Sequence, residues 1–187
     1  MTLEIIIIIA ALIAVPVIFI IITYNTLVAL KNYISESWSN IDTELKRRYD
    51  LIPNLVATVK GYATHEKEVL ERVTELRTRC AANNGTPREQ AVDEVKLVDA
   101  MKQMLAIVEK YPDLKADKHF LELQKELINT EDRIQAARRF FNGNIRDYRN
   151  KYETFPSNIV AMVFAFKPQE FFEVPPSVRD VPDIGNL

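Results

Sequence analysis

The sequence is poor in the residues that build disulfide-rich, metal-binding and turn-dense proteins. Among its 187 residues are one cysteine, two histidines and four glycines. A single Cys80 cannot form an internal disulfide framework, and four glycines argue against a β-rich fold with many tight turns. The net charge of −2 argues against a general nucleic-acid binder. The short basic cluster Lys46–Arg48 is the one feature that favours nucleic-acid binding.

Charged residues are also missing from Ile5 to Leu30, and residues 5–22 form one run of eighteen apolar residues. As a helix this run would reach ~27 Å, close to the ~30 Å hydrocarbon core of a bilayer. The alternative, a cleaved signal peptide, would carry a basic N-terminal region and a shorter apolar stretch. The start Met1–Glu4 has no basic residue, so the sequence predicts a retained membrane anchor and excludes a wholly soluble chain.

The direction of this anchor follows from its flanks. No lysine or arginine precedes the apolar run, whereas Lys31 follows it. The positive-inside rule therefore places the short N-terminus outside and the C-terminal domain in the cytoplasm. Ala10 and Ala14 form a pair of small residues that can bring two spans together.

Apolar residues at spacings of three and four continue directly out of the predicted span. Pro53 lacks an amide proton and its ring clashes one turn back, so we expect the first helix to end or kink near Tyr49. Thr86–Glu89 has the pattern of a capping box with proline at the first helical position, and Asp117 can cap a later helix. The four apolar stripes cover residues 27–45, 56–80, 91–108 and 120–152.

These stripes predict an all-α fold, in which an N-terminal transmembrane helix is continuous with an antiparallel up-down four-helix bundle of long, coiled-coil-like helices. The expected parts are the anchor 1–23, the helical bundle 24–155, an apolar C-terminal segment 156–173, and an extended or disordered tail 174–187.

Several longer segments of the sequence together form a specific pattern. They are Trp38–Asp42, Leu45–Val56, Val59–Ala63 with His65–Glu66, Tyr111–Ala116, Glu131–Ile134, Ala137–Arg139, Asn142 and Phe155–Asn158. This pattern resembles the LemA family of bacterial membrane proteins over about residues 24–166. The resemblance implies an N-terminal span in the bacterial inner membrane, a cytoplasmic helical bundle and no assigned enzymatic activity. Asp132 departs from the pattern, since the family commonly shows asparagine there.

The common catalytic motifs are missing from the sequence. His65–Glu66 begins like a zinc-protease helix, but Val69 stands where the second histidine is needed. A di-iron bundle needs Glu-x-x-His on two helices, and Tyr62 and Ala116 occupy the glutamate positions before His65 and His119. We therefore expect a protein without catalytic residues, metal or cofactor.

Two glutamates nevertheless fall within apolar stripes. Glu66 and Glu131 are each expected thirteen residues from the same end of the bundle, where they would share one layer. Buried charges need partners, which Arg138, Lys60 or Tyr62 could supply. Three interpretations stay open: a structural polar network, solvent exposure through an error in helix register, and a bound cation held by oxygen ligands.

The end of the fourth helix is basic and an apolar segment follows it. In an up-down bundle this end returns to the membrane, so Arg146, Arg149 and Lys151 with Phe164 and Phe166 are expected to contact an anionic membrane surface. The alternative is a solvated charged face and a segment folded back on the bundle.

The sequence as a whole predicts a non-enzymatic, membrane-anchored scaffold or adaptor. Its expected partners are the membrane, other membrane proteins and further copies of itself, with no nucleic acid and no small-molecule substrate. The alternative from another functional class is a metal-dependent enzyme that uses the layer of Glu66 and Glu131.

Overall fold

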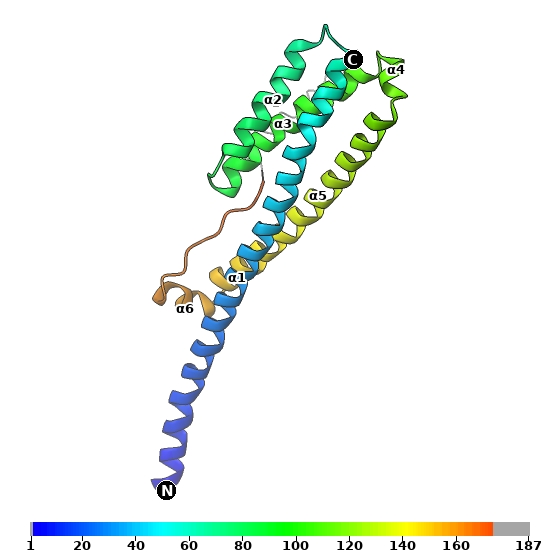
Figure 1. Cartoon of the computed structure of the whole chain (residues 1–187). Helices are drawn as coiled ribbons and strands as arrows, with labels where there is room; N and C mark the ends of the chain where they lie inside the picture. Colours follow the sequence, from blue (N-terminus) through cyan, green and yellow to red (C-terminus); the bar gives the residue numbers. More distant parts are fainter. Residues whose placement is uncertain (1, 174–187) are drawn as a thin grey trace, which may run out of the picture. The chain divides into compact units, whose positions relative to one another are not determined.

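A computed structural model describes residues 2–173, and all regular structure in this range is helical (Figure 1). The predicted all-α fold is confirmed, while the predicted tail 174–187 lies outside the described residues. The helices are α1 (Thr2–Tyr62), α2 (Lys67–Ala82), α3 (Pro87–Val108), α4 (Pro112–Lys115), α5 (Lys118–Glu153) and α6 (Ser157–Val163).

Helix α1 begins as the predicted span and continues without interruption into the domain. Its apolar part is entirely exposed, and within the described residues α1 is the one helix long and apolar enough to cross a membrane. Further along α1, Ile41, Leu45 and Ile52 are buried. One helix therefore contains both the candidate membrane anchor and buried core residues of the folded domain.

The predicted helix end near Tyr49 is wrong, because α1 passes through Pro53 and ends at Tyr62. A proline at position 53 deprives the Tyr49 carbonyl of its usual helical donor. Arg77 of α2 replaces it: its Nε donates to the Tyr49 carbonyl oxygen at 3.0 Å. A tertiary contact thus satisfies the backbone group that would otherwise favour a helix end.

The chain divides into two compact units, through which both α1 and α5 run. We call residues 2–38 and 140–169 the span unit, and residues 39–139 and 170–173 the bundle unit.

The bundle unit contains four long helical segments, from α1, α2, α3 and α5. Arg48 pairs with Glu131 and Tyr62 with Asp117, so α1 and α5 run antiparallel. Short connections make α1 antiparallel to α2 and α2 antiparallel to α3. The core is apolar and contains Ile41, Val73, Phe120 and Leu127 from the predicted stripes, together with Leu55. On α3 the prediction is partly wrong, because Leu97 and Met104 are buried while the predicted core residue Val95 is 39% exposed.

Both predicted helix caps are present in the bundle unit. The Thr86 hydroxyl accepts from the Glu89 backbone amide at 3.3 Å, and the Glu89 carboxylate accepts from the Thr86 amide at 2.8 Å. Asp117 accepts from the Phe120 amide at 2.8 Å, at the start of α5. These bonds satisfy amide groups that have no partner within their own helix.

The span unit has a small core of its own on the domain side of the apolar run. Leu27 and Ile34 of α1 are buried, as are Phe141, Ile145 and Tyr148 of α5. Helix α6 belongs to the same unit and buries Val160 and Ala161. The predicted apolar C-terminal segment therefore contains a short helix.

Candidate functional site

A charged cluster lies inside the bundle unit, with Arg48 at its centre. The Arg48 side chain is only 2% exposed, and it occupies the core stripe of α1 between Leu45 and Ile52. Its Nη1 lies 2.8 Å from the Glu131 carboxylate of α5, and its Nη2 forms an ion pair with Glu94 of α3. One guanidinium thus joins three helices through two carboxylates.

Tyr49 completes the cluster from the next position of α1. Its hydroxyl donates to the Glu94 carboxylate. Burial raises the pKa of the Tyr49 phenol, and the neighbouring Arg48 opposes that shift. Glu94 therefore accepts a hydrogen bond from the phenol and forms an ion pair with the guanidinium, and the two interactions together compensate the burial of its charge.

A cavity of about 160 Å³ adjoins this cluster. Arg138 of α5 lines it, and its guanidinium lies 5.1 Å from the centre of the Phe172 ring. Burial lowers the pKa of Arg138, and Glu173 and Glu131 act against that shift. Phe172 is itself buried, so the chain after α6 contributes an aromatic side chain to the bundle unit.

The structure brings together only part of the predicted polar network. Glu131 and Arg138 both line the cavity, but Glu66 is the half-buried residue that precedes α2, in the turn after α1. Tyr62 donates to Asp117, about 21 Å along α5 from Glu131. Because α1 extends past Pro53, Glu66 falls in a connection and not in a helix facing Glu131. The expected layer of Glu66 and Glu131 is therefore not formed.

Arg48, Tyr49 and Glu94 are the functional candidates that sequence reasoning missed. Arg48 lies three residues after Leu45 and Glu94 lies three after Ala91, so both continue core stripes. Because the predicted stripes consist of apolar residues, charged side chains at core positions fall outside them.

The cluster offers ion pairing and hydrogen bonding between protein groups. Arg48 forms ion pairs with both Glu94 and Glu131, so its guanidinium balances part of the negative charge of the two carboxylates. Within the described residues no group of three or more histidine, cysteine, aspartate or glutamate side chains could hold a metal ion.

The residues predicted to contact the membrane all lie in the span unit. Phe164 and Phe166 contact the Tyr24 ring, with centroid distances of 4.8 and 5.7 Å. Arg146 and Arg149 of α5 are exposed, and Arg149 pairs with Glu153 at 2.7 Å. Lys151 is half-buried, and its carbonyl accepts from the Ser157 hydroxyl at 2.7 Å.

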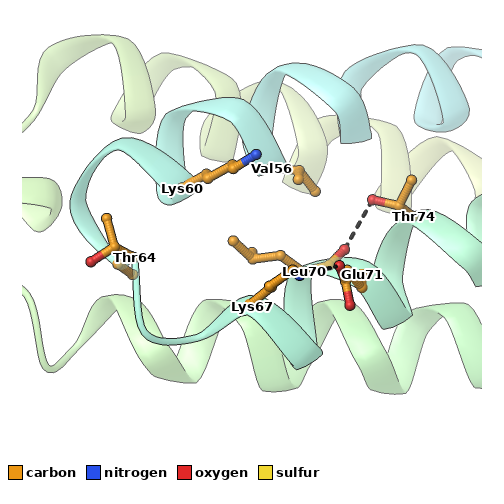
Figure 2. A pocket seen from close by; sticks show the side chains of 8 residues that line it. Val56, Lys60, Thr64, Lys67, Leu70, Glu71 and Thr74 are labelled. Atoms are coloured by element: carbon orange, nitrogen blue, oxygen red, sulfur yellow. Dashed lines mark hydrogen bonds and ion pairs between the residues drawn. The ribbon is translucent and has the colours of Figure 1, made fainter.

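A second hollow, of about 380 Å³, lies where α1 ends and α2 begins (Figure 2). Val56 and Leu70 supply apolar surface from the two helices, and Lys60 and Lys67 supply ammonium groups. Lys67 pairs with Glu71 at 3.4 Å. The hollow thus combines an apolar lining with positive charge, in a different region of the bundle unit from Arg48.

Comparison with known proteins links this architecture to a family. Residues 37–185 match the model of the LemA family, a range that includes Arg48, Glu94, Glu131 and Arg138. The chain is 25% identical to the magnetosome protein MamQ 1 of Paramagnetospirillum magneticum, with 82% of this chain and 66% of that protein covered. MamQ of Magnetospirillum gryphiswaldense gives the same identity and coverage.

A third relative is Protein LemA of Metamycoplasma hominis, which is 30% identical over 73% of this chain and 63% of its own length. The chain spans just under two thirds of the length of the curated relatives it matches.

Proposed function

Because this chain belongs to the LemA family, we propose that it is a membrane-anchored helical scaffold or adaptor that acts by binding proteins and has no catalytic activity. It presents its bundle unit at the cytoplasmic face of the bacterial inner membrane. Its partners are other membrane proteins, further copies of itself and the membrane surface.

The continuity of α1 carries this proposal. The exposed apolar part and the buried residues Ile41 and Ile52 belong to one unbroken helix, with no flexible linker between them. An adaptor needs its binding surface held to the membrane, and a continuous helix provides that without the entropic cost of ordering a linker on binding. The exposed apolar residues Val95, Leu121 and Ile128 of the bundle unit are candidates for the contact surface.

The charged cluster supports a structural interpretation of the core. A buried guanidinium between Glu94 and Glu131 is costly to unpair, so it favours one pairing and one register of α1, α3 and α5. The rival proposal, a metal-dependent enzyme that uses Glu66 and Glu131, loses its motivation because the structure does not bring these two residues together.

The binding function can be tested by photocrosslinking in native membranes. A photoreactive residue at Leu121 or Ile128 should give discrete protein adducts, among them one of twice the chain mass. The same probe with Arg48→Met should lose these adducts if they depend on a correctly packed bundle. Adducts with lipid alone at both positions would contradict the proposal, and a stoichiometric metal in the purified protein would favour the enzyme.

The proposed orientation has its own test. Ala57→Cys in a Cys80→Ala background should resist a membrane-impermeant maleimide in intact cells and react after the inner membrane is opened. Ala57 is exposed and lies outside the proposed contact surface, so protection before opening would come from the membrane and not from burial. Labelling of intact cells would place the bundle unit outside the cytoplasm.

A further inference from the structure

Helix α6 has one buried face and one exposed apolar face. Ser157, Val160 and Ala161 are buried within the span unit. On the other face the exposed fractions reach 52% for Ile159, 78% for Met162 and 72% for Val163. These three positions lie at helical spacing, so they form one continuous apolar stripe.

This stripe lies beside α1 where the apolar run ends. Tyr24 follows Ile22 by two residues, or ~3 Å along the helix. Its ring contacts Phe164, which follows α6 directly and is itself 48% exposed, and then Phe166. The exposed stripe is therefore adjacent to the level at which the predicted span leaves the hydrocarbon core.

We propose that the outer face of α6, with Phe164, is inserted into the interfacial layer of the bilayer. The inference rests on the membrane anchoring in the proposed function and adds a second lipid contact to it. The occupant is lipid because the stripe adjoins the apolar surface of α1, which is itself exposed throughout its length. Tyr24 fits this position, since tyrosine favours membrane–water interfaces.

A free helix of seven residues would bind a bilayer weakly, but α6 is not free. The ring contacts of Phe164 and Phe166 with Tyr24 hold the C-terminal end of α6 to α1, and the span supplies a high effective concentration at the membrane. The Tyr148 hydroxyl of α5 donates to the Lys167 carbonyl at 2.8 Å and so fixes the chain just after α6. The residues that enter the interface are therefore held in place before lipid binds.

The backbone of this segment is also suited to an apolar environment. The amide groups of Phe164, Ala165 and Phe166 donate to carbonyls of α6 at 3.0, 3.1 and 3.0 Å. Paired amides avoid the cost of carrying unsatisfied polar groups toward lipid. The exposed residues Arg146 and Arg149 of α5 add charges that attract anionic headgroups.

Depth-dependent quenching tests the inference on the full chain in lipid vesicles. An environment-sensitive fluorophore at Met162→Cys should emit at shorter wavelength and be quenched by lipids brominated at shallow acyl positions. A Cys80→Ala background removes the native thiol, which is buried and has its pKa raised to about 11 by that burial. Met162 is 78% exposed, so the label does not disturb the core.

Two control sites distinguish a failure of the inference about α6 from a failure of the proposed membrane anchoring. Ala57→Cys is exposed and apolar but belongs to the bundle unit, outside the proposed contact surface, and it should show neither effect. Val17→Cys lies within the apolar run and should be quenched by deeply brominated lipids. Quenching at Val17 without quenching at Met162 would overturn the inference and leave the anchor intact, whereas no quenching at Val17 would overturn the proposed anchoring.

A second copy of the chain could also cover the stripe. In that case the Met162 probe would be shielded from an aqueous quencher, untouched by brominated lipid, and uncovered when the protein is diluted into excess lipid. That result would overturn the lipid contact.

Discussion

Arg48 is buried at the centre of three helices, and its two carboxylate partners differ in their access to water. The Glu94 side chain is 9% exposed and the Glu131 side chain is 29% exposed. Removing a charge from a buried pair leaves the other charge uncompensated, whereas water can replace a partner near the surface. The two ion pairs should therefore contribute unequally to stability.

Glu94→Gln is expected to lower the free energy of unfolding by about 2–4 kcal/mol, and Glu131→Gln by about 1 kcal/mol or less. Glutamine keeps the shape of each side chain, so the difference reports charge. Thermal or denaturant unfolding followed by circular dichroism would measure both. Equal losses would show that burial does not set the strength of these pairs.

Asp93 makes stability depend on acid pH. Burial by itself raises the pKa of this carboxyl, but hydrogen bonds from Arg79 and Asn83 outweigh it and lower the pKa below 3.8. The folded state then binds fewer protons than the unfolded state. Its stabilisation is complete above about pH 4 and is lost as the pH falls through the folded-state pKa.

The melting temperature should accordingly fall on acidification below about pH 4, and Asp93→Asn should reduce the slope of that fall. Asp50→Asn, at an exposed position of α1, is the control and should leave the slope unchanged. An identical slope in the Asp93 variant would assign the acid sensitivity to other carboxyl groups.

At the scale of elements, α1 depends on a bond from another helix. Pro53 removes the helical donor of the Tyr49 carbonyl, and Arg77 supplies a replacement. A buried acceptor without a partner costs about 1–3 kcal/mol. The effect of losing Arg77 should therefore depend on what stands at position 53.

Arg77→Met is expected to cost about 1–3 kcal/mol of unfolding free energy in the native background and clearly less in a Pro53→Ala background, where the restored amide can donate to Tyr49. A double-mutant cycle measures this coupling. Arg72→Met, on the exposed part of α2, is the control. Additive effects of Pro53→Ala and Arg77→Met would show that the two residues act independently.

The connection between α2 and α3 is stabilised by its local capping box. Thr86→Ala should lower the unfolding free energy by about 1 kcal/mol, because it removes the acceptor of the Glu89 amide. Thr43→Ala, at an exposed position inside α1, should have little effect. An equal loss in both variants would indicate that helix propensity and not capping decides the outcome.

Features of the helices that depend on neighbouring residues could be predicted from the sequence, whereas those that depend on contacts between helices could not. The stripe from Leu27 to Leu45, the capping box at Thr86 and the cap at Asp117 depend on neighbours in sequence, so the sequence predicts them. The continuation of α1 through Pro53 depends on Arg77, a residue on another helix, and no local pattern contains that contact. The predicted helix end near Tyr49 misplaced Glu66, because that assignment assumed a new helix starting near Pro53. Arg48 was missed for a different reason, since the predicted stripes were traced through apolar residues.

At the scale of the whole molecule, one helix links the span to the core. The described span has no buried surface of its own, so lipid or a second span must cover it. Ala10 and Ala14 lie four residues apart on one face, and small residues at this spacing allow two helices to approach closely. If the chain self-associates as proposed, we expect the contact to include this face of the span.

Ala10→Leu and Ala14→Leu should each weaken self-association by about 1–3 kcal/mol, the range expected when added methylenes are forced into a packed contact. Energy transfer between labelled chains in vesicles, measured as the protein is diluted with lipid, would report the change. Ala11→Leu adds the same volume on a different face and should leave the association unchanged. Equal losses in all three variants would exclude this face as the contact, and a wild-type chain that shows no energy transfer at any dilution would contradict self-association itself.

A loss in the Ala10 and Ala14 variants alone would identify this face of the span as the contact between two copies. Because α1 continues from the span into the bundle unit, pairing within the bilayer would then bring two copies of the proposed binding surface to the same patch of membrane.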